Sequence, residues 1–376
     1  MTITEILSKT DIPLRKVLTR VIPKQSVFFY SYARKLFLKL LVNESIPERN
    51  LMPIEFSETL WGIDFSVPLF NAAGMFKNGD GYNTAVRQGA GAFLTGTTTK
   101  GGRKGNLKNH ILHPFISFPR TRIAINWMGL PNPGHSIVAK TLSKYDKVHG
   151  CPIGASIAAD PMSSGEELLS CLLDGLQLYE KAGVDFIEIN ESCPNVPSHS
   201  AIISSGLDID LVNRLEYVSK NFISKRNRNI PLIVKFSVDT APSNIASIID
   251  ILLDLGYDGI NLGNTSTSYE TIRQEVSHTE IKLFDHFTST FGGGVSGSAL
   301  KDTSLHLCKL AAEYLTTKQL RHEFHIIRTG GVENAEDIKQ NINNGISLSQ
   351  WFTGYFDSFI INGHGLYKEI FDDEFL

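Results

Sequence analysis

The chain has 376 residues, of which 42% are hydrophobic and 20% charged, so it can bury a large core and is neither disordered nor fibrous. Its formal net charge of −3 argues against a nucleic-acid-binding protein, which normally carries a basic surface that neutralises phosphates. Residues 1–50 carry nine Lys/Arg and four Asp/Glu, a local charge of +5, so the remaining chain carries −8. This asymmetry predicts that the N-terminal segment meets an anionic partner.

The first residues and the cysteines indicate a protein of the reducing cytoplasm. The start of the chain, M-T-I-T-E-I-L-S-K-T-D, lacks the basic region and short apolar run of a secretory signal. The four cysteines show no C-x-x-C pair and no metal-ligand spacing, so we expect neither a disulfide framework nor a metal site. They are Cys151, Cys171, Cys193 and Cys308.

Residues 26–42 form a strongly apolar segment that three cations interrupt. The interruptions come too soon for the roughly 20 apolar residues that a membrane-spanning helix needs. Apolar side chains recur at spacings of three and four, which predicts an amphipathic helix; they are Phe29, Tyr32, Leu36 and Leu40. Such a helix can either pack on the main domain or lie on a membrane surface, and its periodicity favours neither.

After residue 60, eight short apolar runs alternate with helical patterns. The runs are 68–74, 92–97, 153–158, 186–190, 232–237, 259–264, 325–331 and 348–354. Helices are expected between them, for example over 166–182, 209–223 and 243–255. This alternation predicts a parallel sheet with helices outside, and eight units close a (β/α)₈ TIM barrel, an α/β fold. A doubly wound sheet is the competing architecture, but no G-x-G-x-x-G turn follows the first run.

Polar residues that end the apolar runs are the expected functional residues, because active sites of (β/α)₈ barrels lie at the carboxyl ends of the strands. Lys235 ends an otherwise apolar run, where an unpaired ammonium is costly to bury, so we expect it to face a ligand. Gly330 and Gly331 follow the seventh run, and Thr353 and Gly354 follow the eighth. That placement favours a phosphate site, although glycine is also common in tight βα turns.

Cys193 lies directly after the fourth run, in the segment N-E-S-C-P-N. A free cysteine is more often an inert core residue than a catalyst. Asn190 and Asn195 flank it, however, and a cluster of amide donors and acceptors suits a planar polar substrate.

Eight motifs around these positions, between about residues 50 and 360, resemble the dihydroorotate dehydrogenase family. They are N-A-A-G-M-F-K-N-G (71–79), I-N-W-M-G-L-P-N (125–132), N-E-S-C-P-N (190–195), V-K-F (234–236), N-T-S (264–266), G-G-G-V-S-G (292–297), T-G-G-V (329–332) and W-F-T-G (351–354).

The resemblance implies an FMN-dependent oxidation of dihydroorotate to orotate, a step of pyrimidine (UMP) biosynthesis. The implied FMN-binding residues are Lys77, Thr97, Asn190, Lys235, Gly263, Gly297, Gly330, Gly331, Phe352 and Thr353. The implied substrate-binding residues are Lys77, Asn126, Met128, Gly129, Leu130, Asn190, Asn195, Asn264 and Thr265. Cys193 occupies the position of the catalytic base, which removes a proton from C5 of the substrate while a hydride leaves C6 for the flavin.

The match combines features of two classes within the family. Cys193 and the string M-G-L-P-N resemble the soluble class, which passes electrons to fumarate or NAD. Lys77 and the N-terminal extension resemble the membrane-associated class, whose acceptor is a quinone and whose base is usually serine. We expect residues 1–50 to form a helical, membrane-associating segment and residues 51–376 the FMN-binding barrel. The protein is then peripheral on the cytoplasmic side of the inner membrane and re-oxidised by quinone.

Three rival functions fit parts of the sequence. A flavin barrel that reduces uridine in transfer RNA also uses a cysteine, but the acidic barrel lacks the basic surface that such a substrate needs. A Schiff-base aldolase would use Lys235 and no flavin. An inactive barrel that serves as a scaffold would bind neither cofactor nor substrate.

Replacing Cys193 tests its implied role as the base. We expect Cys193→Ala to keep its flavin but to slow flavin reduction by dihydroorotate roughly 10²- to 10⁴-fold, the usual effect of losing a positioned base. Cys193→Ser should keep partial activity with an optimum at higher pH, because a hydroxyl is a weaker acid than a thiol. Anaerobic stopped-flow absorbance measures both. Wild-type reduction kinetics in the alanine variant would exclude Cys193 as the base.

Overall fold

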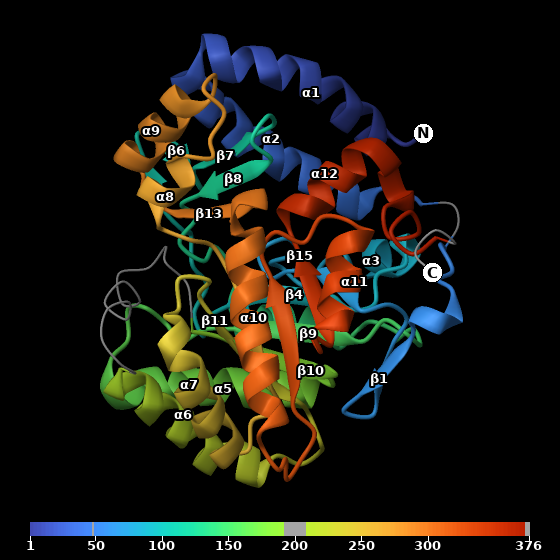
Figure 1. Ribbon diagram of the computed structural model, residues 1–376, viewed down its shortest axis with the longest axis vertical. Helices are drawn as coiled ribbons and strands as arrows, with labels where there is room; N and C mark the ends of the chain where they lie inside the picture. Colours follow the sequence, from blue (N-terminus) through green and yellow to red (C-terminus); the bar gives the residue numbers. More distant parts are fainter. Residues whose placement is uncertain (47–48, 192–207, 373–376) are drawn as a thin grey trace.

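The computed structural model describes residues 1–46, 49–191 and 208–372, and its centre is a barrel of eight parallel strands (Figure 1). Each strand coincides with one of the eight apolar runs, so the predicted (β/α)₈ barrel is confirmed. The strands are β3 (Leu69–Asn71), β4 (Phe93–Thr98), β9 (Ile153–Ile157), β10 (Phe186–Asn190), β11 (Leu232–Phe236), β12 (Gly259–Leu262), β14 (His325–Thr329) and β15 (Leu348–Trp351).

The first and last strands of the sheet, β3 and β4, are joined by a side chain. Asn71 Nδ2 donates to the carbonyl of Leu94 (2.7 Å), and Asn71 Oδ1 accepts from the amide of Leu94 (3.2 Å). Just beyond, the amide of Gly74 donates to the carbonyl of Gly96 (2.7 Å). Asn71 is 1% exposed, so its amide group takes the place of a ladder hydrogen bond and closes the barrel.

Helices cover the outside of the barrel and agree closely with the predicted ranges. The predicted helix over 166–182 is α5 (Gly165–Ala182). The other two helices are α6 (Ile209–Asn221) and α7 (Ile245–Asp254), and both are shorter than expected. A 3₁₀ turn follows α6 and another precedes α7. The remaining outer helices are α3 (Tyr82–Gln88), α4 (His135–Leu142), α10 (Lys301–Thr316), α11 (Ala335–Asn343) and α12 (Thr353–Asn362).

A short hairpin closes the amino-terminal end of the barrel. It consists of β1 (Glu58–Leu60) and β2 (Ile63–Phe65), and its Trp61 donates a hydrogen bond to the carbonyl of Asp258 (2.9 Å). Trp61 and Phe65 pack in one apolar cluster with barrel residues such as Phe186. This end of the barrel is therefore filled, which leaves the carboxyl ends of the strands as the open end of the barrel.

A second, antiparallel sheet lies at the carboxyl end of the barrel and was not predicted from the sequence. It contains β7 (Phe115–Phe118), β8 (Ile123–Asn126) and β13 (Gly294–Gly297), in the order β13-β8-β7. The small elements around it are β5 (Leu107–Lys108), β6 (Ile111–Leu112), α8 (Tyr269–Arg273) and α9 (Ile281–Thr290). The sheet shares an apolar cluster with α9 and with the N-terminal helices (Figure 1).

The N-terminal extension is a pair of helices, α1 (Ile3–Val21) and α2 (Pro23–Asn43), as expected for residues 1–50. A capping box of Thr2 and Glu5 starts α1, and Pro23 starts α2. Helix α2 contains the amphipathic segment predicted over 26–42 and lies against β7, while α1 lies against α12 (Figure 1).

Buried polar contacts fasten the ends of this helix pair to the barrel. His364 Nε2 lies 3.1 Å from Glu44 Oε2 at the end of α2, and the amide of His364 donates to Glu5 Oε1 (3.1 Å). The amide of Thr4 also donates to Glu44 Oε1 (3.1 Å). The start of α1 and the end of α2 are therefore tied to the turn that follows α12.

Asn71→Ala tests the role of this side chain in closing the barrel. It would leave the buried amide and carbonyl of Leu94 unpaired, at about 1–3 kcal/mol for each group. We expect the free energy of unfolding to fall by at least about 1 kcal/mol, the cost of one unpaired group. Urea titrations followed by circular dichroism measure this change. The matched control is Asn43→Ala, an exposed residue of α2, with a change within about 0.5 kcal/mol. Equal effects of the two variants would contradict the closure.

Candidate functional site

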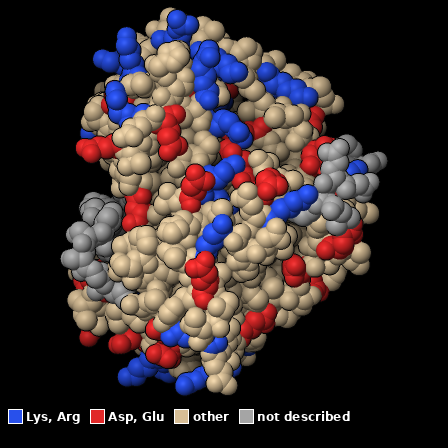
Figure 2. Space-filling model, in the orientation of Figure 1, with Lys and Arg blue, Asp and Glu red and all other residues tan. Residues whose placement is uncertain are grey.

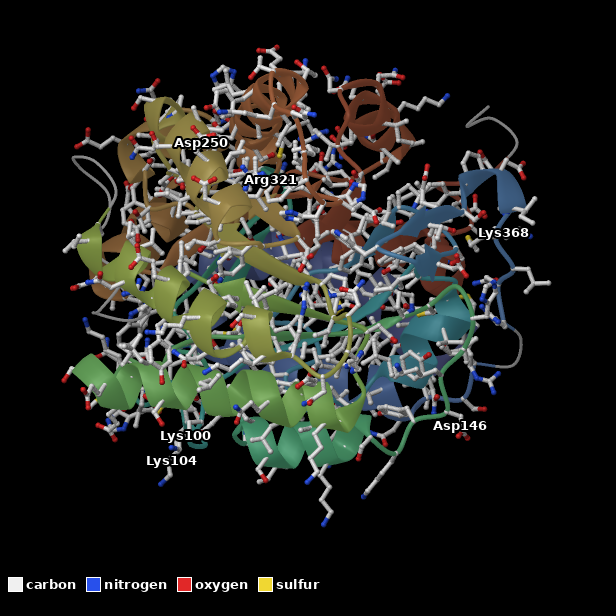
Figure 3. All side chains as sticks on the ribbon, turned by 90° about the horizontal axis from the view of Figure 1, so that it is seen from below. Lys100, Lys104, Asp146, Asp250, Arg321 and Lys368 are labelled. Carbon is white, nitrogen blue, oxygen red and sulfur yellow. The ribbon has the colours of Figure 1, made fainter. Side chains whose placement is uncertain are left out.

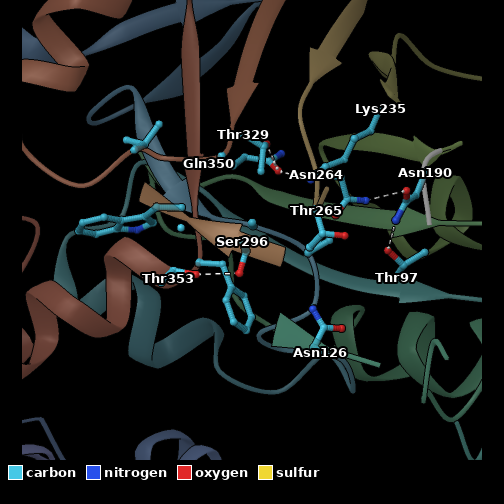
Figure 4. Close-up of a pocket in the computed structure, with 18 of the residues that line it drawn as sticks. Thr97, Asn126, Asn190, Lys235, Asn264, Thr265, Ser296, Thr329, Gln350 and Thr353 are labelled. Atoms are coloured by element: carbon cyan, nitrogen blue, oxygen red, sulfur yellow. Dashed lines mark hydrogen bonds between the residues drawn. The ribbon is translucent and has the colours of Figure 1, made fainter. Parts of the chain in front are cut away.

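A polar cavity opens at the carboxyl ends of the barrel strands (Figure 4). Its empty volume, including the open mouth, is about 940 Å³. Its walls come from five barrel strands and from the second sheet. The polar side chains that line it are Lys77, Thr97, Asn126, Asn190, Lys235, Asn264, Thr265, Ser296, Thr329, Gln350 and Thr353.

Lys235 places an ammonium at the inner wall of the cavity. It is 2% exposed, and its Nζ donates to Gln350 Oε1 (2.8 Å) and lies 3.7 Å from Glu188 Oε1. Burial lowers the pKa of Lys235 below its ordinary value, while the Glu188 carboxylate opposes that shift. Lys235 therefore lines the cavity, and its contact with a ligand stays a prediction.

A buried polar network holds Lys235 and its partners in place. Glu188 Oε2 accepts from Asn261 Nδ2 and from Gln350 Nε2, both at 2.8 Å. The Thr329 hydroxyl lies 2.9 Å from Asn261 Oδ1 and 3.0 Å from Gln350 Oε1. Because these side chains fix one another's orientation, the ammonium has a single direction of approach to a ligand. Sequence analysis missed Glu188, Asn261 and Gln350, although each is a polar residue inside an apolar run.

The loops after β14 and β15 bring backbone amides to one end of the cavity. Gly330 and Gly331 both have positive φ, +112° and +71°, and a Cβ at Gly331 would lie 2.3 Å from the Cα of Lys301. Thr353 and Gly354 form the first turn of α12, whose free amides point out of the helix N-terminus. This arrangement is the one in which (β/α)₈ barrels bind phosphate.

Arg328 supports this phosphate-type loop from behind. It is fully buried and donates to Ser304 Oγ (2.9 Å), Asn341 Oδ1 (2.6 Å) and the carbonyl of Lys301 (2.8 Å). Ser304 in turn donates to the carbonyl of Gly330 (2.7 Å). Arg328 therefore links α10, α11 and the glycine turn into one rigid unit.

Amide and hydroxyl groups gather on the other side of the cavity (Figure 4). Asn190 Nδ2 donates to Thr97 Oγ1 (2.9 Å), and Asn264 Nδ2 donates to Asn190 Oδ1 (3.4 Å). The hydroxyl of Thr265 is buried without a hydrogen-bond partner among the described residues. A buried polar atom of this kind costs free energy unless a ligand pairs with it, so the group is suited to a polar ligand.

Asp239 positions the loop that carries Asn264 and Thr265. Its carboxylate accepts from the hydroxyl of Ser266 (2.5 Å) and from the amide of Thr267 (2.8 Å).

Across the cavity, Lys77 Nζ lies 3.2 Å from Met128 Sδ, which is only a weak acceptor. Lys77 and Met128 thus form the edge opposite the Asn264 loop.

The structure brings together nearly all of the predicted site residues that it describes. Two do not line the cavity. Gly263 packs on β14, where a Cβ would lie 1.6 Å from the carbonyl of Thr329, and Gly129 packs on the side chain of Asn106. Both are backbone positions that need glycine beside the cavity. Cys193 and Asn195 lie outside the described residues.

A second, apolar cavity lies between the N-terminal helices and α12, with an empty volume of about 1390 Å³ including its mouth. Phe352 and Thr353 line both cavities, so the two meet at the start of α12. The apolar side chains of this second cavity are Leu7, Leu14, Phe29, Ala33, Leu36, Phe37, Leu40, Phe115, Ala124, Phe352, Phe356, Phe359 and Ile360. Three of the four residues of the predicted amphipathic face, Phe29, Leu36 and Leu40, are among them.

A few polar groups project into the apolar cavity. Arg15 forms an ion pair with Asp11 and lies over the ring of Tyr30, whose hydroxyl donates to Asp11 (3.0 Å). Burial lowers the pKa of Arg34 to about 10 and raises that of Asp357 to about 6. The cavity therefore combines mostly apolar walls with a few charged groups.

Comparisons with known proteins agree with this architecture. The family model described as dihydroorotate dehydrogenase matches residues 55–371. A "Dihydroorotate dehydrogenase (quinone)" of Photobacterium profundum is 29% identical over 336 residues, which cover 89% of each chain. The protein of the same name from a Marinomonas species is 28% identical over 310 residues, 82% of this chain and 81% of the relative. A crystal structure of DHODH from Eimeria tenella in complex with ferulenol superposes with a TM-score of 0.75 at 20% identity, covering 91% of this chain and 90% of that one.

The glycine turn after β14 offers a test of the phosphate site with a matched control. Gly331 and Gly345 have the same φ of +71°, but only at Gly331 would a Cβ collide with backbone, since the nearest atom at Gly345 is 3.7 Å away. In both alanine variants the new side chain is strained by the positive φ, at a similar cost of about 1 kcal/mol or slightly more. We expect Gly331→Ala alone to lose cofactor phosphate, measured as phosphorus per chain after dialysis. Equal phosphorus in both variants would place the phosphate elsewhere.

Proposed function

Because the chain belongs to the dihydroorotate dehydrogenase family, we propose that it oxidises dihydroorotate to orotate, with FMN as the first electron acceptor and a quinone as the second. The observation that carries the first part is the polar cavity, where a buried cation, a phosphate-type loop and a cluster of amides converge. The observation that carries the second part is the apolar cavity, which meets the polar one at Phe352 and Thr353.

The residues at the phosphate-type loop fit FMN. The turn at Gly330 and Gly331 and the first turn of α12 offer backbone amides for one phosphate group. Lys235 would lie beside the isoalloxazine ring and stabilise negative charge on it. Thr97 and Asn190 offer polar contacts to the same ring. When bound, FMN would take two electrons from the substrate and release them to the second acceptor.

The amide cluster fits the pyrimidine ring of dihydroorotate. The ring presents alternating N–H and C=O groups and a carboxylate, which match the donors and acceptors of Asn126, Asn190 and Asn264 and the hydroxyl of Thr265. Lys77 would balance the charge of the carboxylate. Cys193 and Asn195, which follow β10, complete the site in this proposal as catalytic base and substrate ligand.

A quinone fits the apolar cavity better than fumarate does. Fumarate is a small dianion that needs water or paired cations around it, whereas most of the residues that line this cavity are apolar. Arg15 is already paired with Asp11. A quinone has an apolar ring and tail with two carbonyl oxygens, so it needs apolar walls and few polar contacts. The named relatives carry "(quinone)" in their descriptions.

The outer faces of α1 and α2 fit a peripheral contact with a membrane. Among the described residues, no helix is long and apolar enough to cross a bilayer. Lysine and arginine side chains gather over α1 at the upper edge of the molecule (Figure 2). Exposed apolar side chains on the same helix pair that do not line the apolar cavity are Ile3, Ile6, Val17, Val21, Phe28 and Tyr32. Buried apolar area together with attraction to anionic lipid is the usual basis of interfacial binding, and a quinone is dissolved in that lipid.

Ala33→Trp tests the apolar cavity as the quinone site by filling it. We expect kcat/KM for a short-chain quinone to fall at least about 10-fold, which corresponds to ~1.4 kcal/mol. Flavin reduction by dihydroorotate should stay at the wild-type rate, because it takes place in the other cavity. The control is Phe28→Trp, which adds the same side chain at an exposed position of α2. Unimpaired quinone turnover in Ala33→Trp would refute the assignment.

Charge reversal on α1 tests the membrane contact. Full-length protein should sediment with anionic phospholipid vesicles and be released as salt increases. The double variant Lys16→Glu with Arg20→Glu should bind at least about 10-fold more weakly, because each basic residue contributes about 1 kcal/mol at such a surface. Lys220→Glu with Lys225→Glu makes the same charge change at the opposite end of the molecule and should bind as wild type. Equal loss in both double variants would argue against a specific face.

A further inference from the structure

We infer that Asp357 of α12 is the acid that protonates a quinone oxygen in the apolar cavity while the quinone is reduced. The inference rests on the proposed quinone-dependent function and adds a catalytic residue to it. No sequence motif pointed to Asp357, which follows the W-F-T-G segment by three residues.

The position of Asp357 connects the two cavities. It lines the apolar cavity, one helical turn after Thr353, so both side chains lie on the same face of α12. Thr353 lines both cavities, and its hydroxyl lies 2.9 Å from the hydroxyl of Ser296 at the wall of the polar cavity (Figure 4). An acceptor ring that reaches the junction therefore lies between the electron source and this carboxyl group.

Asp357 has only a long ion pair among the described residues, with Arg122. Its Oδ2 is buried without a hydrogen bond, and the nearest cation, Arg122 Nε, is 4.0 Å away. Arg122 is held instead by Glu333, at 3.1 Å between NH2 and Oε1, and Lys301 Nζ lies 3.1 Å from the other oxygen of Glu333. The side chain of Asp357 is 34% exposed, so the carboxyl group can still reach a ligand and water.

The surroundings of Asp357 favour its protonated form. Burial is the main cause that raises its pKa to about 6, the negative charge of Glu333 adds to the shift, and Arg122 and Arg15 oppose it. The charged and titratable groups that line the apolar cavity with it are Asp11, Arg15, Tyr30 and Arg34. An apolar ring that displaces water from the cavity would raise the pKa further, towards the neutral range in which a general acid is most effective.

The other polar groups of the cavity are poorer proton donors. Asp11 accepts hydrogen bonds from Arg15 and Tyr30. Burial raises the pKa of Tyr30 above its ordinary value, and Arg34, with a pKa of about 10, is too weak an acid to donate a proton near neutral pH. Asp357 is therefore the group whose protonation state changes near physiological pH.

The proton and electron balance of this step is simple. A quinone becomes a quinol by taking up two electrons and two protons. The electrons and one proton come from a two-electron donor of the flavin class in the polar cavity, which dihydroorotate has reduced. The second proton comes from Asp357: its O–H bond breaks as a quinol O–H bond forms. Water at the exposed side of the carboxylate then returns a proton to Asp357.

The test separates the two half-reactions in full-length holoenzyme. Wild type, Asp357→Asn, Asp357→Glu and the control Asp250→Asn, a carboxylate on the outer surface (Figure 3), are mixed anaerobically with dihydroorotate and then with a short-chain quinone. The neutral acid is the active form, so wild-type re-oxidation should be fastest at low pH and slow down as pH rises through and above about 6. Asp357→Asn should lose this pH dependence and re-oxidise roughly 10²-fold more slowly, the lower end for a lost general acid.

Three further results accompany this loss if the inference is right. Asp357→Asn should reduce its flavin with dihydroorotate at the wild-type rate, which also shows that it folds. Asp357→Glu should recover part of the rate and of the pH dependence, and Asp250→Asn should match wild type. Infrared difference spectra of the oxidised protein should show a carboxyl signal that titrates near pH 6 in wild type and is absent from Asp357→Asn.

The inference and the proposed function fail in different ways. If quinone re-oxidises wild type but Asp357→Asn keeps the same rate and pH profile, the assignment of Asp357 is wrong and the quinone site stands. If the infrared titration is unchanged in Asp357→Asn, the carboxyl group is not the titrating acid and the assignment is again wrong. If quinone does not re-oxidise wild type at any pH, the proposed function itself is wrong and the inference falls with it.

Discussion

The ammonium of Lys235, buried at the carboxyl end of β11, dictates the polar centre of the barrel. An isolated charge at this depth would cost far more free energy than the fold can supply, so neighbouring strands must provide partners. Glu188 on β10 and Gln350 on β15 contact the ammonium, and Asn261 on β12 donates to Glu188, at positions where most barrels of this kind carry aliphatic side chains. The network orients the cation toward the cavity, and in the proposed function it is the group that stabilises charge on the flavin.

Two cavities of opposite character meet at one short stretch of chain, Phe352–Thr353. On the barrel side lie a cation, amides and the phosphate-type loop, and on the other side lies an apolar space between α12 and the N-terminal helices. This division suits a reaction in two halves, because a polar substrate and a lipid-soluble acceptor never need to occupy the same space. Asp357 would then deliver the proton where water is scarce, one helical turn from the junction.

The sequence was most informative where chemistry and periodicity coincide. Each barrel strand is an apolar run bounded by glycine or polar residues, so all eight could be predicted, and residues that line the polar cavity, such as Lys235 and Asn264, stand at their ends. The antiparallel strands β7, β8 and β13 were missed because each has only four residues, and β13 pairs with β8, which lies far away in the chain. Gln350 and Asp357 could not be assigned from sequence, because their roles depend on partners more than 100 residues away: Lys235 and Arg122. Gly263 and Gly129 were expected in the site because of the family resemblance, yet neither lines the cavity, and both pack beside it.

The central claim is that electrons pass from dihydroorotate in the polar cavity to a quinone in the apolar cavity. The most direct measurement is anaerobic stopped-flow absorbance of the purified full-length protein, mixed first with dihydroorotate and then, in separate experiments, with a short-chain quinone or fumarate. The account predicts that the flavin bands bleach with dihydroorotate and return rapidly with the quinone but not with fumarate. Failure of dihydroorotate to bleach the flavin, or rapid return with fumarate alone, would contradict it.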